Sequence, residues 1–398
     1  MNKAELSQES LRPGIPRTVI ALGFVSLFMD LSSEIIHALL PLFLTATLGA
    51  SVAMVGMIDG IAEATAAISK IFSGYVSDRI GRRKPLILLG YGLAAITKPL
   101  FAVANGAGVV LGARFADRIG KGLRGAPRDA LVADVTPPAI RGRAFGLRQA
   151  MDTVGAFLGP LIAIGLMMLL SNDMRAVFRI AAIPAILSAL IVLVWVKEPP
   201  RPAGHAARPP LHWREIAHLE RGYWPVVGIG VVFTLARFSE AFLVLRASDR
   251  GLPLALAPLV LVAMNAVYSL GAYPAGIISD RIPPRRLLQW GLVCLALADG
   301  LLAFGSGLVP IFAGIALWGG HMALTQGLLA KMVADQSSER LRGTAFGLFN
   351  LATGIAMLIA SVAAGLLWDH LGPAATFIAG GALAVLTLIL SAAVKGRT

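Results

Sequence analysis

The sequence predicts an all-α membrane protein in which twelve transmembrane helices form two pseudo-symmetric six-helix bundles. The chain has 398 residues, of which 57% are hydrophobic and 14% are charged, whereas about 25% of the residues of a soluble domain are charged. Apolar stretches of about 20 residues, enough to cross a bilayer, recur along its whole length. Two loop sequences of the first half also recur in the second half.

The apolar stretches set the expected elements and domains. Spans are expected near 18–44, 52–76, 85–103, 109–133, 144–169, 177–196, 224–247, 253–278, 287–304, 309–334, 344–367 and 373–394. The hydrophilic stretch between the sixth and seventh spans reads as a linker. We therefore expect an N-terminal six-helix bundle (1–197), a cytoplasmic linker (198–223) and a C-terminal six-helix bundle (224–398).

The distribution of charge predicts how the chain crosses the membrane. The net charge is +13, and the Lys and Arg residues gather in alternate loops such as 77–84 and 134–143. Because basic loops stay in the cytoplasm, we expect both termini there, in a multi-pass protein of the inner (plasma) membrane. This placement explains the charge without a nucleic-acid partner. The single cysteine, Cys294, excludes an intramolecular disulfide and a Cys-rich metal site.

An internal repeat relates the two halves. The segment VADVTPPAIRGRAFGL, which begins at Val132, is matched by VADQSSERLRGTAFGL, which begins at Val333. The segment GYVSDRIGRRK at Gly74 is likewise matched by GIISDRIPPRR at Gly276. The two pairs of segments are separated by nearly the same number of residues. We therefore expect two bundles of the same orientation, related by an axis along the membrane normal.

The fourth span is unusually charged. On a helix, one face of about 140° would hold Arg114, Asp117, Arg118, Lys121, Arg124, Arg128 and Asp129. A cytoplasmic amphipathic helix would also fit this pattern, but it would break the alternation of basic loops. We therefore expect a transmembrane helix, and charges at membrane depth suggest function.

Two motifs resemble those of a known family. The loop after the second span holds Gly74, Asp78, Arg79, Gly81, Arg82 and Arg83. This pattern resembles the loop signature of the major facilitator superfamily. The fifth span holds Gly155, Gly159 and Pro160, which resemble a motif of proton-coupled antiporters in that superfamily, with Ile162 and Ala163 where a glycine pair is usual.

The resemblance implies a secondary active transporter that moves a small organic solute by alternating access. It favours proton-coupled efflux by antiport. An importer of an organic anion and a flippase of amphiphiles or lipids remain alternatives. The resemblance also implies that Arg82 and Arg83 reach Asp134 and close the cytoplasmic side. Gly155 and Gly159 would form a groove for close helix packing, and Pro160 would allow a bend.

The first span offers candidates for proton coupling. Asp30 and Glu34 are one turn apart, with His37 on the same face, and Asp30 lies about 19 Å beyond the start of the span. A carboxylate at that depth could load and release a proton as the cavity changes sides. The alternative is a fixed salt bridge to the fourth span.

Candidates for substrate binding come mainly from the fourth span. Arg114, Arg118 and Lys121 could bind an anionic or zwitterionic solute, with Glu240 and His321 as further candidates. The alternative is a compensated charge network, in which Asp59 and Glu63 pair with Lys98 or with the fourth-span arginines.

The sequence offers no chemistry typical of an enzyme. It has no His-rich metal cluster, no Ser-centred nucleophile elbow and no phosphate-binding loop. We therefore expect a non-enzymatic monomer without cofactor or metal, whose partners are the substrate, protons and the lipid bilayer.

Overall fold

The computed structural model describes residues 14–199, 216, 218–279, 281–325, 328–338 and 341–393. Regular structure in these residues is helical, as the sequence predicts. The expected linker, 198–223, lies largely outside the described residues, so its boundaries stay a prediction.

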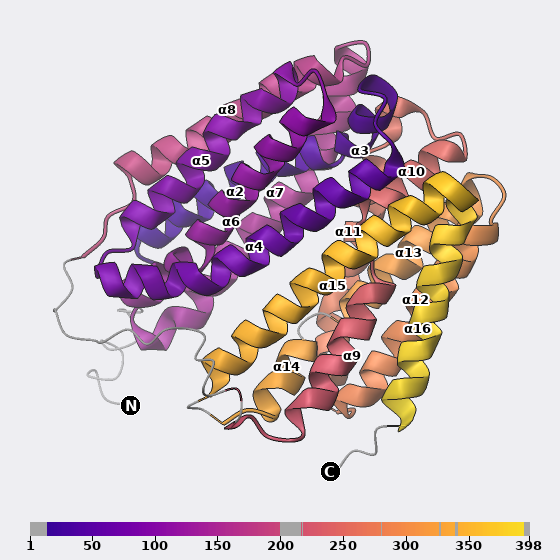
Figure 1. Cartoon of the computed structure of the whole chain (residues 1–398). Coiled ribbons are helices and arrows are strands. Elements are labelled where there is room, and N and C mark those ends of the chain that lie inside the picture. The colour runs from indigo at the N-terminus through magenta and orange to yellow at the C-terminus, as the bar shows by residue number, and fades with distance from the viewer. Residues whose placement is uncertain are drawn as a thin grey trace, which may run out of the picture.

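The first group of helices, called the N-half, packs as one bundle (Figure 1). Its helices are α2 (Arg17–His37), α3 (Leu40–Leu42), α4 (Val52–Ile80), α5 (Lys84–Val103), α6 (Ala107–Val135), α7 (Arg141–Leu169) and α8 (Met174–Val194). A π-helical turn (Phe43–Thr47) follows α3, and a 3-10 turn (Pro138–Ile140) precedes α7. Helix α2 packs on α7 and α8, and α6 packs on α4 and α5.

The second group, called the C-half, lies beside the first (Figure 1). Its helices are α9 (Tyr223–Ala236), α10 (Ala241–Asp249), α11 (Leu259–Ser279), α12 (Pro284–Phe304), α13 (Leu308–Thr325), α14 (Leu328–Asp335), α15 (Arg342–Leu371) and α16 (Pro373–Ala393). A 3-10 turn (Leu254–Leu256) precedes α11. Helix α12 packs on α13 and α16, and α9 packs on α15 and α16.

The predicted class of fold is confirmed. Eleven helical segments of the described residues are long and apolar enough to cross a membrane. Helix α6 is missing from this set because its charges lower its hydropathy. Its 29 residues extend about 44 Å, and it packs along α4 and α5, which are both spans. With α6 the spans agree with the twelve that the sequence predicts.

One expected span is broken at its centre. The stretch expected as one helix over 224–247 is divided into α9, which ends at Ala236, and α10, which begins at Ala241. The Ser239 hydroxyl accepts a hydrogen bond from the backbone N–H of Ala241 at 3.1 Å. A serine side chain that binds nearby backbone in this way favours a helix start over a helix interior.

The helix directions define two sides of the molecule. The basic side holds the end of α4 at Ile80 and the starts of α7 and α15 at Arg141 and Arg342. The opposite side holds the start of α4 at Val52 and the end of α15 at Leu371.

The two halves touch mainly toward the opposite side. There α10 packs on α3, and the Asp369 carboxylate accepts backbone N–H groups of Val52 at 3.0 Å and Ala53 at 2.8 Å. A Cβ on Gly56 of α4 would overlap the Ser361 carbonyl of α15. Figure 1 shows α4 and α15 separating toward the basic side.

Candidate functional site

A polar cavity of about 380 Å³ lies between the halves, toward the basic side. Helices α2, α4, α6 and α7 supply its charged lining, and α11 supplies a neutral polar wall. The charged lining residues are Asp30, Glu34, Lys70, Lys121, Arg124, Arg128, Asp129 and Asp152. The cavity therefore brings together the acids of α2 and the bases of α6, two groups that the sequence singles out separately.

Asp30 and Glu34 lie where α7 packs very closely on α2. A Cβ on Gly155 would lie 2.5 Å from the Leu27 carbonyl oxygen and 3.2 Å from the Asp30 Cβ. A Cβ on Gly159 would lie 2.6 Å from the Glu34 Cβ. The expected packing role of these two glycines is confirmed, and it places them directly against the acids expected to carry protons. Pro160 follows inside α7 and is buried.

The two acids have different surroundings. Glu34 has the imidazole of His37 at 3.5 Å from its carboxylate. Asp30, among the described residues, has no basic side chain within 4.0 Å, so the fixed salt bridge to α6 does not form in this arrangement. Its carboxylate instead faces the cavity.

Deep in the N-half, the charges of α6 are largely compensated by neighbouring helices. Arg114 contacts Asp59 at 3.4 Å, and Arg118 contacts Glu63 at 3.4 Å. The Lys98 ammonium contacts Asp117 at 3.0 Å. The expected pairing of Asp59 and Glu63 with α6 arginines is confirmed. These pairs lie outside the lining of the cavity.

Nearer the basic side, Arg128, Asp129, Arg148 and Asp152 form a second compensated cluster. Arg148 contacts Asp152 at 2.6 Å and Asp129 at 3.7 Å. Arg128 contacts Asp129 at 3.1 Å and Asp152 at 3.9 Å. Two bases and two acids cancel here, so the cluster adds no net charge to the cavity.

Three cations of the cavity have no carboxylate within 4.0 Å in the described part of the chain, namely Lys70, Lys121 and Arg124. The Arg124 guanidinium lies over the Tyr91 ring, 4.7 Å from its centroid, and donates to the Gly90 carbonyl at 3.4 Å. These three cations line the same cavity as the two acids of α2.

The remaining expected site residues lie elsewhere. Arg114 is 1% exposed and His321 is 0% exposed, with His321 Nδ1 3.1 Å from the Gly291 carbonyl. Glu240 contacts Arg237 at 3.5 Å at the break between α9 and α10. None of these three lines the cavity, and their binding role stays a prediction.

The expected gating residues lie at the basic end of α4. Arg83 contacts Asp78 at 2.7 Å and Asp134 at 3.0 Å, which links α4 to α6 within the N-half. Gly81 ends α4 with a φ of +72°, a left-handed conformation that favours glycine. Gly74 packs against Ala126, Arg79 donates to Tyr75 at 3.3 Å, and Arg82 lines a separate cavity.

Sequence reasoning missed the wall that α11 supplies, made of Asn265, Tyr268 and Ser269. These polar residues stand in an apolar span, a signal that was available but weak beside the charges of α6. The cavity position of Lys70 could have been inferred from its place inside the second span.

Comparison with known proteins decides the family. The sequence model of the Major Facilitator Superfamily matches residues 22–263 and 226–398. The chain belongs to the Major Facilitator Superfamily. It is therefore a secondary transporter rather than an enzyme.

Individual relatives agree with this assignment. An uncharacterized MFS-type transporter of Methanocaldococcus jannaschii is 32% identical over 384 residues, which cover 94% of each chain. The multidrug resistance protein MdtH of Salmonella typhi is 26% identical over 89% of this chain and 85% of its own. The solved structure of the nucleoside transporter NupG superposes with a TM-score of 0.81 at 13% identity, over 94% of this chain and 99% of that one. At that identity the structural likeness concerns the fold alone.

Proposed function

We propose that this superfamily member is a proton-coupled exporter that binds a small organic solute in the cavity between its halves. The observation that carries the proposal is that Asp30 and Glu34 line the same cavity as Lys70, Lys121 and Arg124. A proton and a charged solute in that space must influence each other electrostatically.

Asp30 is the residue that we propose to carry the proton, and Glu34, one helical turn away, is the second candidate. Asp30 lines the cavity and has no ion-pair partner among the described residues, so gain or loss of a proton there changes the cavity charge directly. The Glu34 carboxylate, by contrast, lies 3.5 Å from the His37 imidazole. The contact of Gly155 and Gly159 with the backbone beside both acids would transmit a change on α2 to α7.

The expected orientation supports export as the direction of transport. If the basic side faces the cytoplasm, as its Lys and Arg residues indicate, the cavity lies toward the cytoplasm, the side from which an exporter loads its solute. The name of the relative MdtH, a multidrug resistance protein, is consistent with efflux.

One observation favours a second candidate, the proton-coupled import of an organic anion. Three cations without a carboxylate partner share the cavity with two acids, which leaves one positive charge in excess. Protonation of Asp30 would increase the excess and strengthen the binding of an anion. Because such coupling is reciprocal, anion and proton would then move in the same direction.

Proteoliposomes that contain the full chain and a pH-sensitive dye test the proposal. A panel of organic cations, zwitterions and anions is presented with and without an imposed pH gradient. If the protein is a proton-coupled antiporter, an outward proton gradient should drive uptake of at least one solute of the panel into the proteoliposomes. Addition of that solute outside should in turn drive protons out of the proteoliposomes. Solute and protons that move together would instead identify the anion importer.

The Asp30→Asn variant tests whether Asp30 carries the proton. It should lose gradient-driven accumulation and keep solute exchange at equilibrium, since exchange needs no net proton movement. Asp173→Asn, at an exposed aspartate on the opposite side, is the matched control and should behave like the wild type. A pH gradient without effect on the wild type would rule out proton coupling, and normal accumulation by Asp30→Asn would exclude Asp30 as the carrier.

A further inference from the structure

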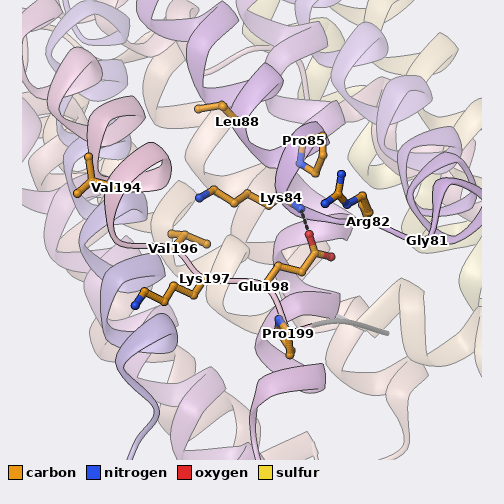
Figure 2. A pocket seen from close by; sticks show the side chains of 10 residues that line it. All are labelled: Gly81, Arg82, Lys84, Pro85, Leu88, Val194, Val196, Lys197, Glu198 and Pro199. Atoms are coloured by element: carbon orange, nitrogen blue, oxygen red, sulfur yellow. Dashed lines mark hydrogen bonds between the residues drawn. The ribbon is translucent and has the colours of Figure 1, made fainter. Parts of the chain in front are cut away.

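A second cavity, of about 950 Å³, lies at the basic side where α5 begins and α8 ends (Figure 2). Its charged lining consists of Arg82, Lys84, Lys197 and Glu198. The surrounding end of α8 is apolar and exposed, with Val194 64% and Trp195 62% accessible. Exposed apolar side chains on a membrane-spanning helix face lipid, and a tryptophan there is typical of the interface with water. The cavity therefore lies at the level of lipid head groups.

The charge of this cavity favours an anion. The carboxylate of Glu198 already accepts the backbone N–H groups of Arg83 at 2.5 Å and Lys84 at 2.9 Å. Three cations remain against one engaged carboxylate. Figure 2 shows the side chains of Lys84 and Lys197 extending toward the side of the cavity where Val194 lies.

An apolar groove of about 560 Å³ lies beside this cavity. Phe24 and Phe28 of α2 form one wall, and α8 forms the other with Leu187, Leu190, Val194 and its neighbours. The groove is lined only by apolar side chains. Val194 lines both spaces, so the basic cavity and the apolar groove are adjacent.

We propose that the basic cavity and the groove together bind one anionic phospholipid. Lys84 and Lys197 would hold the phosphate, and an acyl chain would lie along α8 between Val194 and Leu187. These two residues are about 10 Å apart along the helix, a length that suits the upper part of an acyl chain. Basic pockets between transmembrane helices on the cytoplasmic side are known to bind anionic head groups.

The site differs from the transport cavity in position and in ligand. Its residues belong to α2, to the loop before α5 and the start of α5, and to α8 and the segment that follows it, and it shares no lining residue with the cavity that holds Asp30. The proposal therefore stands or falls independently of the transported solute.

Native mass spectrometry of the full chain, released from detergent micelles with added lipid, tests the site. We expect the wild type to retain dioleoyl phosphatidylglycerol about tenfold more strongly than dioleoyl phosphatidylcholine, because only the former has a net negative charge. Lys84→Gln with Lys197→Gln should remove most of that preference. Leu190→Gln, which makes the groove polar and leaves the charge unchanged, should weaken retention of both lipids.

Two controls make the result specific. Arg285→Gln with Arg286→Gln removes the same charge at the basic end of α12 and should leave lipid retention unchanged. Equal losses in the two double variants would overturn the proposal, since general positive charge would then explain binding. Soluble glycerol 3-phosphate is the competitor, and displacement of the lipid by it at equal concentration would identify a site for free phosphate instead.

Discussion

At the scale of single residues, close packing against α2 connects the antiporter-like motif of α7 to the acids of the cavity. Gly155 and Gly159 leave room for the α2 backbone beside Asp30 and Glu34. The motif therefore has a physical role that sequence alone could not specify, since the sequence did not show which helix the glycines contact.

Gly159→Ala should separate α2 from α7. The added Cβ would lie 2.6 Å from the Glu34 Cβ, and such overpacking costs about 1–3 kcal/mol. We expect a lower midpoint of thermal unfolding and slower transport. Gly165→Ala in the same helix is the control, because no atom lies within 4 Å of its added Cβ. Equal stability of the two variants would contradict the packing role.

The buried pair of Lys98 and Asp117 should matter more for stability than the pair of Arg118 and Glu63. The Lys98 and Asp117 side chains are 1% and 4% exposed, whereas Glu63 is 47% exposed. Asp117→Asn leaves a buried cation without its partner, which costs about 3–5 kcal/mol. Glu63→Gln breaks a pair open to water and should cost about 0–1 kcal/mol.

Thermal unfolding of both variants in the same detergent measures this difference. The double variant Asp117→Asn with Lys98→Met removes both charges and should recover much of the stability lost by Asp117→Asn. A larger loss for Glu63→Gln than for Asp117→Asn would contradict the assignment of the pairs.

At the scale of elements, an aspartate on α15 links the halves by binding the start of α4. The Asp369 carboxylate accepts the N–H groups of Val52 and Ala53, which α4 leaves without partners at its first turn. This contact crosses between the halves on the opposite side, so it would be lost if the halves separated there. The Ser239 hydroxyl adds a second link by donating to Asp59 at 2.7 Å.

Asp369→Ala should therefore favour closure of the basic side. Loss of such a helix-capping carboxylate costs about 1 kcal/mol, which shifts a two-state equilibrium about fivefold. A cysteine at Ser269, in a Cys294→Ser background, should react more slowly with a thiol reagent because it lies in the cavity.

The matched control is Asp173→Ala. Asp173 caps α8 within the N-half by accepting the Ala176 N–H at 3.1 Å, so its loss should leave the accessibility of the cavity unchanged. Equal labelling of Ser269→Cys in all three backgrounds would show that Asp369 does not hold the halves together.

At the scale of the whole molecule, the halves touch mainly at the end of the bundle that lies opposite the basic side. The basic side carries Arg79, Arg141 and the α12 arginines, and it is also the side toward which the cavity lies. A cytoplasmic basic side, with both termini there, would make this arrangement the inward-open one.

Cysteine labelling in whole cells tests that orientation. Thr47→Cys lies on the opposite side and Arg143→Cys on the basic side, and both positions are exposed. An impermeant thiol reagent should label Thr47→Cys in intact cells and should label Arg143→Cys only after the membrane is permeabilised. The reverse pattern would place the termini outside and would contradict export from this arrangement.

The sequence by itself determined the class of fold and the approximate positions of the spans, and its motifs already resembled those of the family. Apolar length and loop charge depend on local composition, and the repeat is visible without any structure. The acids of α2 and the bases of α6 could be recognised because residues four apart share one face of a helix.

Only the tertiary structure decided which charges are compensated. Arg114 and Arg118 find their carboxylates on α4, and Asp117 finds Lys98 on α5, so the α6 charges that looked alike in sequence are divided between a buried network and an open cavity. The cross-half links of Asp369 and Ser239 and the α11 wall also join distant segments. Such pairings depend on how helices pack in space, and the pattern along any single helix does not specify them.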